Sequence, residues 1–131
     1  MKPSVATLLL TILLLGTACG GKDSPPPPPA AQELTEAEIA EVNPFKGEAS
    51  AIAEGKRLFA IKCSPCHGPD GTGGAEAPDL TDGVTIYSGT DRAVFKIIYS
   101  GTGKGMPTWK AELGPESIWK VMAYVESLRQ R

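Results

Sequence analysis

Apolar residues recur at helical intervals in three parts of the chain, and their spacing predicts three main helices. The first is expected over residues 49–62, the second over residues 90–100, and the third from Pro115 to about residue 129. Thr90 suits the N-cap of the second helix and Gly101 follows its last turn, while Pro115 suits the first turn of the third. The third helix carries the clearest apolar stripe, formed by Ile118, Val121, Met122, Val125 and Leu128.

The segments between these helices predict loops, because residues 68–89 and 101–114 are rich in glycine and contain proline. Upstream of the first helix, Thr35 and Glu38 make a capping box that favours a short helix over residues 36–42, and Asn43-Pro44 ends it. No segment shows the alternation of a strand. We therefore expect an all-α domain of about three main helices over residues 44–131.

The apolar content of this domain is small for its length. Two long glycine-rich loops leave few aliphatic side chains to build an independent core. Something other than side chains is expected to fill the middle of the domain.

The beginning of the chain has the pattern of an export signal. Lys2 carries a positive charge, and residues 5–16 are nearly all apolar or small, a run too short for a comfortable membrane span. The stretch LLGTACGG resembles a bacterial lipobox, in which Cys19 would become the lipidated first residue after removal of residues 1–18. Gly16 departs from the leucine usual at its position, and ordinary cleavage that leaves a spare thiol is the alternative. Either reading places the protein in a bacterial periplasm, and the first anchors it to a membrane.

Residues 19–43 are expected to form a tether. The run SPPPPPAA favours an extended polyproline II spacer, or plain disorder without a mechanical purpose. Residues 22–49 contain two basic and six acidic side chains, a balance of −4, whereas residues 50–131 contain ten basic and nine acidic ones, a balance of +1. No basic field favours nucleic acid as a partner.

The candidate chemistry lies in the stretch KCSPCHGPDG. It holds two of the three cysteines, Cys63 and Cys66, and the only histidine, His67. The spacing C-x-x-C-H is the attachment signature of haem c, since two thiols at the end of a helix can add to the vinyl groups on one edge of the porphyrin while the histidine reaches the iron. A disulfide would leave His67 unexplained, a thioredoxin-like dithiol lacks its βαβ context, and a structural zinc site wants four ligands.

A second iron ligand follows by elimination among the three methionines. Met1 leaves with the signal, and Met122 lies in the apolar stripe of the last helix, where core packing explains it better. Met106 lies in the loop TGKGMPTW, whose glycines would let the backbone fold closely over a flat ring. A thioether ligand favours ferrous iron and raises the potential. The alternative is a methionine on a surface loop.

Residues from about Pro44 to the end resemble the class I c-type cytochromes, which are small monohaem electron carriers of bacterial periplasms. The matching pieces are EGKRLFAIKCSPCHG, APDL, GMPTW and IWKVMAYVESL. The resemblance implies thioether links from Cys63 and Cys66 to one haem c, with His67 as the proximal and Met106 as the distal ligand of the iron. The tether lies outside the family pattern.

The resemblance also implies contacts around the haem. The first and last helices would cross, with Gly55 and Phe59 meeting an aromatic residue near Trp119 or Tyr124. Pro78 or Pro65 would border the haem, and a backbone carbonyl of the first loop would orient the His67 ring.

Three functions remain open. The first is one-electron transfer between redox protein partners, in which an iron with two protein ligands offers no open position to a substrate, so the protein would not be an enzyme by itself. The second is a tethered haem subunit of a larger oxidoreductase, such as a quinol-oxidising complex, a terminal oxidase or a quinoprotein dehydrogenase. The third is a gas sensor or peroxidase in which Met106 leaves the iron. Lysines 62, 104 and 110 either ring the haem edge to steer partners or are scattered solvated charges.

Overall fold

The computed structural model describes residues 33–75, 77–83 and 89–129 of the chain. The predictions for the export signal, for lipidation at Cys19 and for the proline run lie outside them. The elements are a 3-10 turn η1 (Glu36–Glu38) and the helices α1 (Ala49–Lys62), α2 (Ser64–His67), α3 (Asp91–Ser100) and α4 (Lys110–Leu128). The described residues contain no strand, which confirms the expected all-α class. Within the same residues, no helix combines the length and apolarity that crossing a membrane requires.

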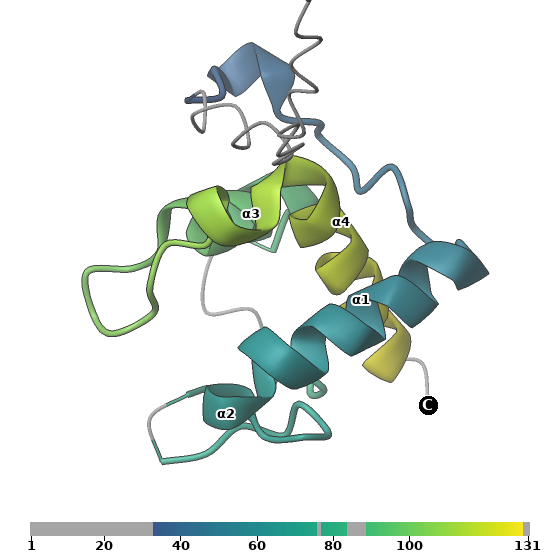
Figure 1. Cartoon of the computed structure of the whole chain (residues 1–131), viewed down its shortest axis with the longest axis vertical. Coiled ribbons are helices and arrows are strands. Elements are labelled where there is room, and N and C mark those ends of the chain that lie inside the picture. The colour runs from purple at the N-terminus through teal and green to yellow at the C-terminus, as the bar shows by residue number, and fades with distance from the viewer. Residues whose placement is uncertain (1–32, 76, 84–88, 130–131) are drawn as a thin grey trace, which may run out of the picture.

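Helices α1 and α4 cross and make the main packing contact of the fold (Figure 1). A Cβ atom on Gly55 would lie 2.0 Å from the carbonyl oxygen of Lys120, so only glycine permits this approach of the two backbones. Next to the crossing, Phe59 meets Tyr124 edge to face, with 5.3 Å between ring centroids. The crossing implied by the family resemblance is therefore confirmed, with Tyr124 rather than Trp119 as the aromatic partner.

Helix α3 begins and ends as predicted and packs on the first half of α4. The hydroxyl of Thr90 accepts a hydrogen bond from the amide of Ala93 (3.3 Å), as an N-cap should. Phe95 is stacked on Trp119 with 4.3 Å between ring centroids and on Tyr99 with 5.6 Å. These stacked rings join α3 to α4.

Helix α4 is two helical pieces joined at Gly114. The backbone of Gly114 has a φ of 68° and a ψ of 169°, and Pro115 then starts the long helix where the sequence placed it. The preceding turn was expected to be loop. It is helical because the carbonyl of Trp109 accepts hydrogen bonds from the amides of Glu112 (3.2 Å) and Leu113 (2.9 Å).

Residues 33–43, which the sequence pattern predicts to be part of the tether, pack on the helical domain. We call them the N-terminal strap. Ile39 is 5% exposed and lies in one buried cluster with Phe95, Tyr99 and Trp119. Asn43 is 4% exposed, and its side-chain amide donates a hydrogen bond to the carbonyl of Trp119 (3.0 Å). Residues 33–43 are therefore packed against the helical domain, although the sequence predicts a domain that begins near Pro44.

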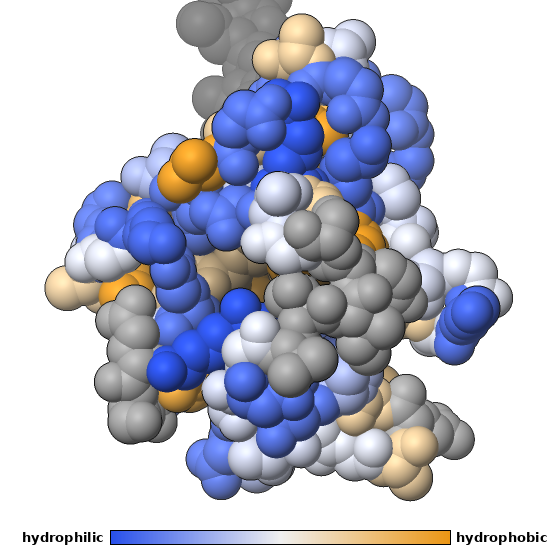
Figure 2. All heavy atoms as spheres, turned by 180° about the vertical axis from the view of Figure 1, so that it is seen from behind, coloured by the Kyte–Doolittle hydropathy of each residue, from blue (hydrophilic) through white to orange (hydrophobic). Residues whose placement is uncertain are grey.

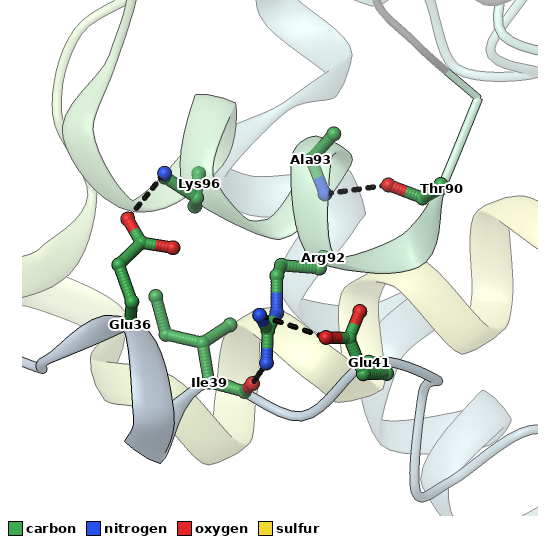
Figure 3. Close-up of polar contacts among 7 residues, drawn as sticks. All are labelled: Glu36, Ile39, Glu41, Thr90, Arg92, Ala93 and Lys96. Atoms are coloured by element: carbon green, nitrogen blue, oxygen red, sulfur yellow. Dashed lines mark hydrogen bonds and ion pairs between the residues drawn. The ribbon is translucent and has the colours of Figure 1, made fainter.

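Polar contacts hold the strap along α3 (Figure 3). The guanidinium of Arg92 donates a hydrogen bond to the carbonyl of Ile39 (2.6 Å) and forms an ion pair with Glu41 (2.8 Å), and Lys96 pairs with Glu36. The predicted capping box is present, because the amide of Thr35 donates to the carboxylate of Glu38 (2.8 Å). The helix expected over residues 36–42 is a single turn, because Ile39 adopts extended backbone angles that bring its carbonyl to Arg92.

Candidate functional site

The cysteine motif occupies the junction of α1 and α2. The amide of Cys63 still donates to the carbonyl of Phe59 (2.9 Å), and the carbonyl of Cys63 then accepts from the amides of Cys66 (3.2 Å) and His67 (2.9 Å). Pro65 lies in the first turn of α2, where its missing N–H has no helical partner to lose. One turn of helix therefore carries both thiols and the imidazole.

The His67 ring is oriented by the loop that follows it. Its Nδ1 lies 3.1 Å from the carbonyl oxygen of Pro78. A carbonyl can only accept a hydrogen bond, so this contact assigns the proton to Nδ1 and leaves the lone pair on Nε2, the arrangement of a histidine that binds a metal. The family resemblance implied such a carbonyl, and the structure identifies it as that of Pro78.

Backbone hydrogen bonds bring Pro78 back to His67. The amide of Gly73 donates to the carbonyl of His67 (2.9 Å), that of Gly74 to Ala77 (2.9 Å), and that of Leu80 to Gly71 (2.8 Å). The loop predicted after the motif is therefore closed on itself and places a carbonyl acceptor at the imidazole.

The two thiols differ in their surroundings. Cys63 is half-buried against the cluster that contains Phe59 and Leu128, whereas Cys66 is exposed, and no disulfide joins the two. Burial, and secondarily the nearby Cys66, raises the pKa of Cys63 to about 11. As a free thiol, Cys63 would therefore be protonated at neutral pH.

Met106 and Met122, the two methionines among the described residues, have different environments. Met122 is 7% exposed and belongs to the buried cluster of Ile39 and Phe95, which confirms the packing role predicted for it. Met106 is half-buried in the loop between α3 and α4. In Figure 1 this loop and α2 extend to the same side of the crossed helices α1 and α4.

The three candidate lysines are not equivalent. The Nζ atom of Lys62 lies 2.6 Å from a carboxylate oxygen of Glu112 and 5.7 Å from the centroid of the Trp109 ring. Lys110 pairs with Glu33 of the strap. Lys104 is exposed at the loop tip, and the described residues offer it no ion-pair partner. Two of the three charges are thus tied to carboxylates, which sequence spacing could not reveal.

These residues fit a haem c. Two thiols and an imidazole with a free Nε2 share one helical turn, and a thioether lies in a loop on the same side of the fold. The buried side chains form two separate clusters, one around Phe95 and Trp119 and one around Phe59 and Tyr124. Figure 2 shows the molecule from behind, with hydrophobic surface at the bottom of a hollow bordered by hydrophilic segments. A flat apolar ring matches a fold whose own side chains do not make one continuous core.

Fold and motif together define a c-type cytochrome, a haem protein that transfers electrons. Residues 50–125, more than half of the chain, match the family described as cytochrome C oxidase, cbb3-type, subunit III, and the chain belongs to this family. The cofactor of the C-x-x-C-H motif is thus covalent haem c, rather than the zinc or dithiol alternatives.

Named relatives agree with this class. The chain is 36% identical over 84 residues to the Cbb3-type cytochrome c oxidase subunit FixP of Azorhizobium caulinodans, covering 63% of this chain and 29% of the relative. It is 40% identical over 90 residues to the subunit CcoP of Rhodobacter capsulatus, covering 62% and 30%. The chain therefore spans under a third of the length of the curated relatives that it matches.

Two solved structures have a similar fold. Cytochrome cL from Methylophaga aminisulfidivorans aligns with a TM-score of 0.63 at 29% identity, over 84% of this chain and 71% of that one. Cytochrome cL from Hyphomicrobium denitrificans aligns with a TM-score of 0.64 at 24% identity, over 76% and 61%, which supports the fold alone.

Proposed function

We propose that the protein transfers single electrons between redox partners on the periplasmic side of a bacterial membrane. Cys63 and Cys66 hold the haem by thioether links, and His67 and Met106 are the two protein ligands of its iron. The observation that carries the proposal is the 3.1 Å contact between His67 Nδ1 and the Pro78 carbonyl oxygen. This contact occupies Nδ1 and leaves the lone pair of Nε2 available to bind the iron.

The bound haem supplies a one-electron couple between ferrous and ferric iron. The chain keeps this couple reversible by holding its ligands in place: α1 and α2 present His67, the closed loop fixes its ring, and the loop after α3 presents Met106. With His67 and Met106 both bound to the iron, no position would remain for a substrate. The protein is therefore an electron carrier rather than an enzyme by itself.

The test is an absorption spectrum of the reduced, haem-loaded full chain before and after carbon monoxide. The wild-type protein should give a low-spin c-type spectrum that the gas does not change. The variant Met106→Ala should bind the gas readily, whereas the matched control Met122→Leu should behave as wild type. A wild-type protein that binds the gas at once would contradict the saturated iron and favour the sensor or peroxidase alternative.

Membership of an oxidase complex is a second candidate, favoured by the matched family. In that role the domain would be a haem-bearing module that passes electrons to a larger oxidoreductase. The experiment is affinity purification of the tagged full chain from detergent-solubilised membranes of its own host. Stable recovery with an oxidase would support the subunit, and recovery as a free monomer would support the carrier.

A lipid anchor on Cys19 would restrict either role to a membrane surface. The tether would let the haem domain move between partners near that surface. Export of wild type and Cys19→Ala, followed by separation of membranes from soluble periplasm, tests the anchor. The wild type should remain with membranes and the variant should be released; identical fractionation of the two would contradict lipidation.

A further inference from the structure

The loop that carries Met106 is closed at its base by contacts between its two arms. The hydroxyl of Thr108 donates a hydrogen bond to the carbonyl of Tyr99 (2.7 Å), and the amide of Trp109 donates to the carbonyl of Ile98 (3.2 Å). The segment after Met106 is thus held against the last turn of α3. These two contacts fix the base of the loop but do not touch Met106.

A single residue, Thr102, contacts both backbone polar groups of Met106. The amide of Thr102 donates to the carbonyl of Met106 (2.9 Å), and the amide of Met106 donates to the hydroxyl of Thr102 (3.3 Å). Gly101 makes room for this approach: its φ is +74°, and a Cβ there would lie 2.7 Å from the Met106 carbonyl oxygen. The next residue, Pro107, has no N–H, so the amide of Met106 is the last backbone hydrogen-bond donor before Thr108.

The tip of the loop has no comparable support. Residues 103–105, Gly-Lys-Gly, are exposed, and two glycines leave the backbone there conformationally free. The methionine side chain adds further rotatable bonds of its own. The two hydrogen bonds from Thr102 therefore restrain the backbone of Met106 against movements of the flexible tip.

We infer that Thr102 is a positioning residue for Met106, and that its hydroxyl holds the thioether in the place from which it ligates the iron. This inference rests on the proposed function, because it takes Met106 to be the distal ligand. Loss of the hydroxyl leaves the amide of Met106 without its acceptor and raises the fraction of molecules in which the sulfur has left the iron. An added ligand that binds only those molecules gains affinity in proportion to that fraction.

Imidazole binding to the ferric, haem-loaded full chain measures this fraction. Thr102→Val has a similar shape but lacks the acceptor, and it should bind imidazole about three- to tenfold more tightly than wild type, the range expected for the loss of one modest hydrogen bond. Thr102→Ser retains a hydroxyl and should stay within about twofold of wild type. The matched control is Thr108→Val, which removes a hydroxyl from the same loop without touching Met106 and should also stay close to wild type.

Met106→Ala tests the ligand role of Met106 separately from the positioning role of Thr102, and it should bind imidazole most tightly. If Met106→Ala raises the affinity but Thr102→Val does not, the positioning role of Thr102 is wrong and the ligand assignment stands. If the imidazole affinity of Thr108→Val rises as much as that of Thr102→Val, any contact that closes the loop has this effect, which also overturns the inference. If Met106→Ala binds imidazole no more tightly than wild type, Met106 is not the ligand and both statements fail. Far-ultraviolet circular dichroism of each variant checks that the helices remain.

Discussion

Replacing Ile39 by alanine tests whether the N-terminal strap is part of the folded domain. Ile39 is 5% exposed and packs with Phe95 and Trp119, so the change removes three buried carbon atoms from the core. Such truncations cost about 2–5 kcal/mol in protein cores. Because the strap is held at the edge of the domain and can relax, we expect the lower end, about 2 kcal/mol, or roughly a thirtyfold change in the folding equilibrium.

The assay is urea unfolding of the haem-loaded protein, followed by circular dichroism of the helices. The unfolding midpoint of Ile39→Ala should fall by about 1 M urea with an unchanged slope. The control is Val42→Ala in the same strap, where the side chain is 61% exposed and the effect should be within about 0.5 kcal/mol. Equal midpoints for the two variants would show that Ile39 does not stabilise the fold and would place the start of the cooperative domain at Pro44.

Three further predictions follow from other contacts. Gly55→Ala should destabilise the protein by about 3 kcal/mol or more, because its Cβ would lie 2.0 Å from the Lys120 carbonyl oxygen and the helices must separate; thermal unfolding within a few degrees of wild type would contradict this. Asn43→Ala removes a buried amide that bonds two backbone groups and should cost about 1–3 kcal/mol in urea unfolding, and a smaller loss would mean that water replaces the amide. A hydrogen bond from Lys96 lowers the pKa of Glu36 below its ordinary value of 4.5, so its contribution to stability is present above pH 4.5 and is lost as the pH falls through the lower folded value. The stability difference between wild type and Glu36→Gln should therefore vanish in acid, and a difference independent of pH would argue against the ion pair.

Local patterns were sufficient for the main parts of α1, α3 and α4. The predicted first helix over residues 49–62 has the bounds of α1, and the cap at Thr90 and the start at Pro115 were both found in place. These features depend on neighbouring residues, which a sequence displays directly. The motif around Cys63 and His67 is local in the same sense, since one helical turn brings its three side chains together.

The contacts that complete the site are not local. The acceptor for His67 could have been any carbonyl of a long loop, and only the closed path of that loop selects Pro78, eleven residues away. The ion pair between Lys62 and Glu112 joins residues fifty positions apart. Thr102 offered a weak signal, a hydroxyl four residues before Met106, but nothing in the spacing showed that both groups would turn toward each other.

The class of cofactor and the helices that present it can be predicted from the sequence, because haem attachment requires residues at fixed short spacing and helices follow from periodicity. The packing of residues 33–43 on the domain depends instead on tertiary contacts. Ile39 and Asn43 look like parts of a polar tether when read in order, and the surface that buries them is made by α3 and α4. The amide of Asn43 meets the carbonyl of Trp119 across 76 positions of sequence. A partner that distant leaves no periodic trace, because burial depends on which surfaces the folded chain brings together.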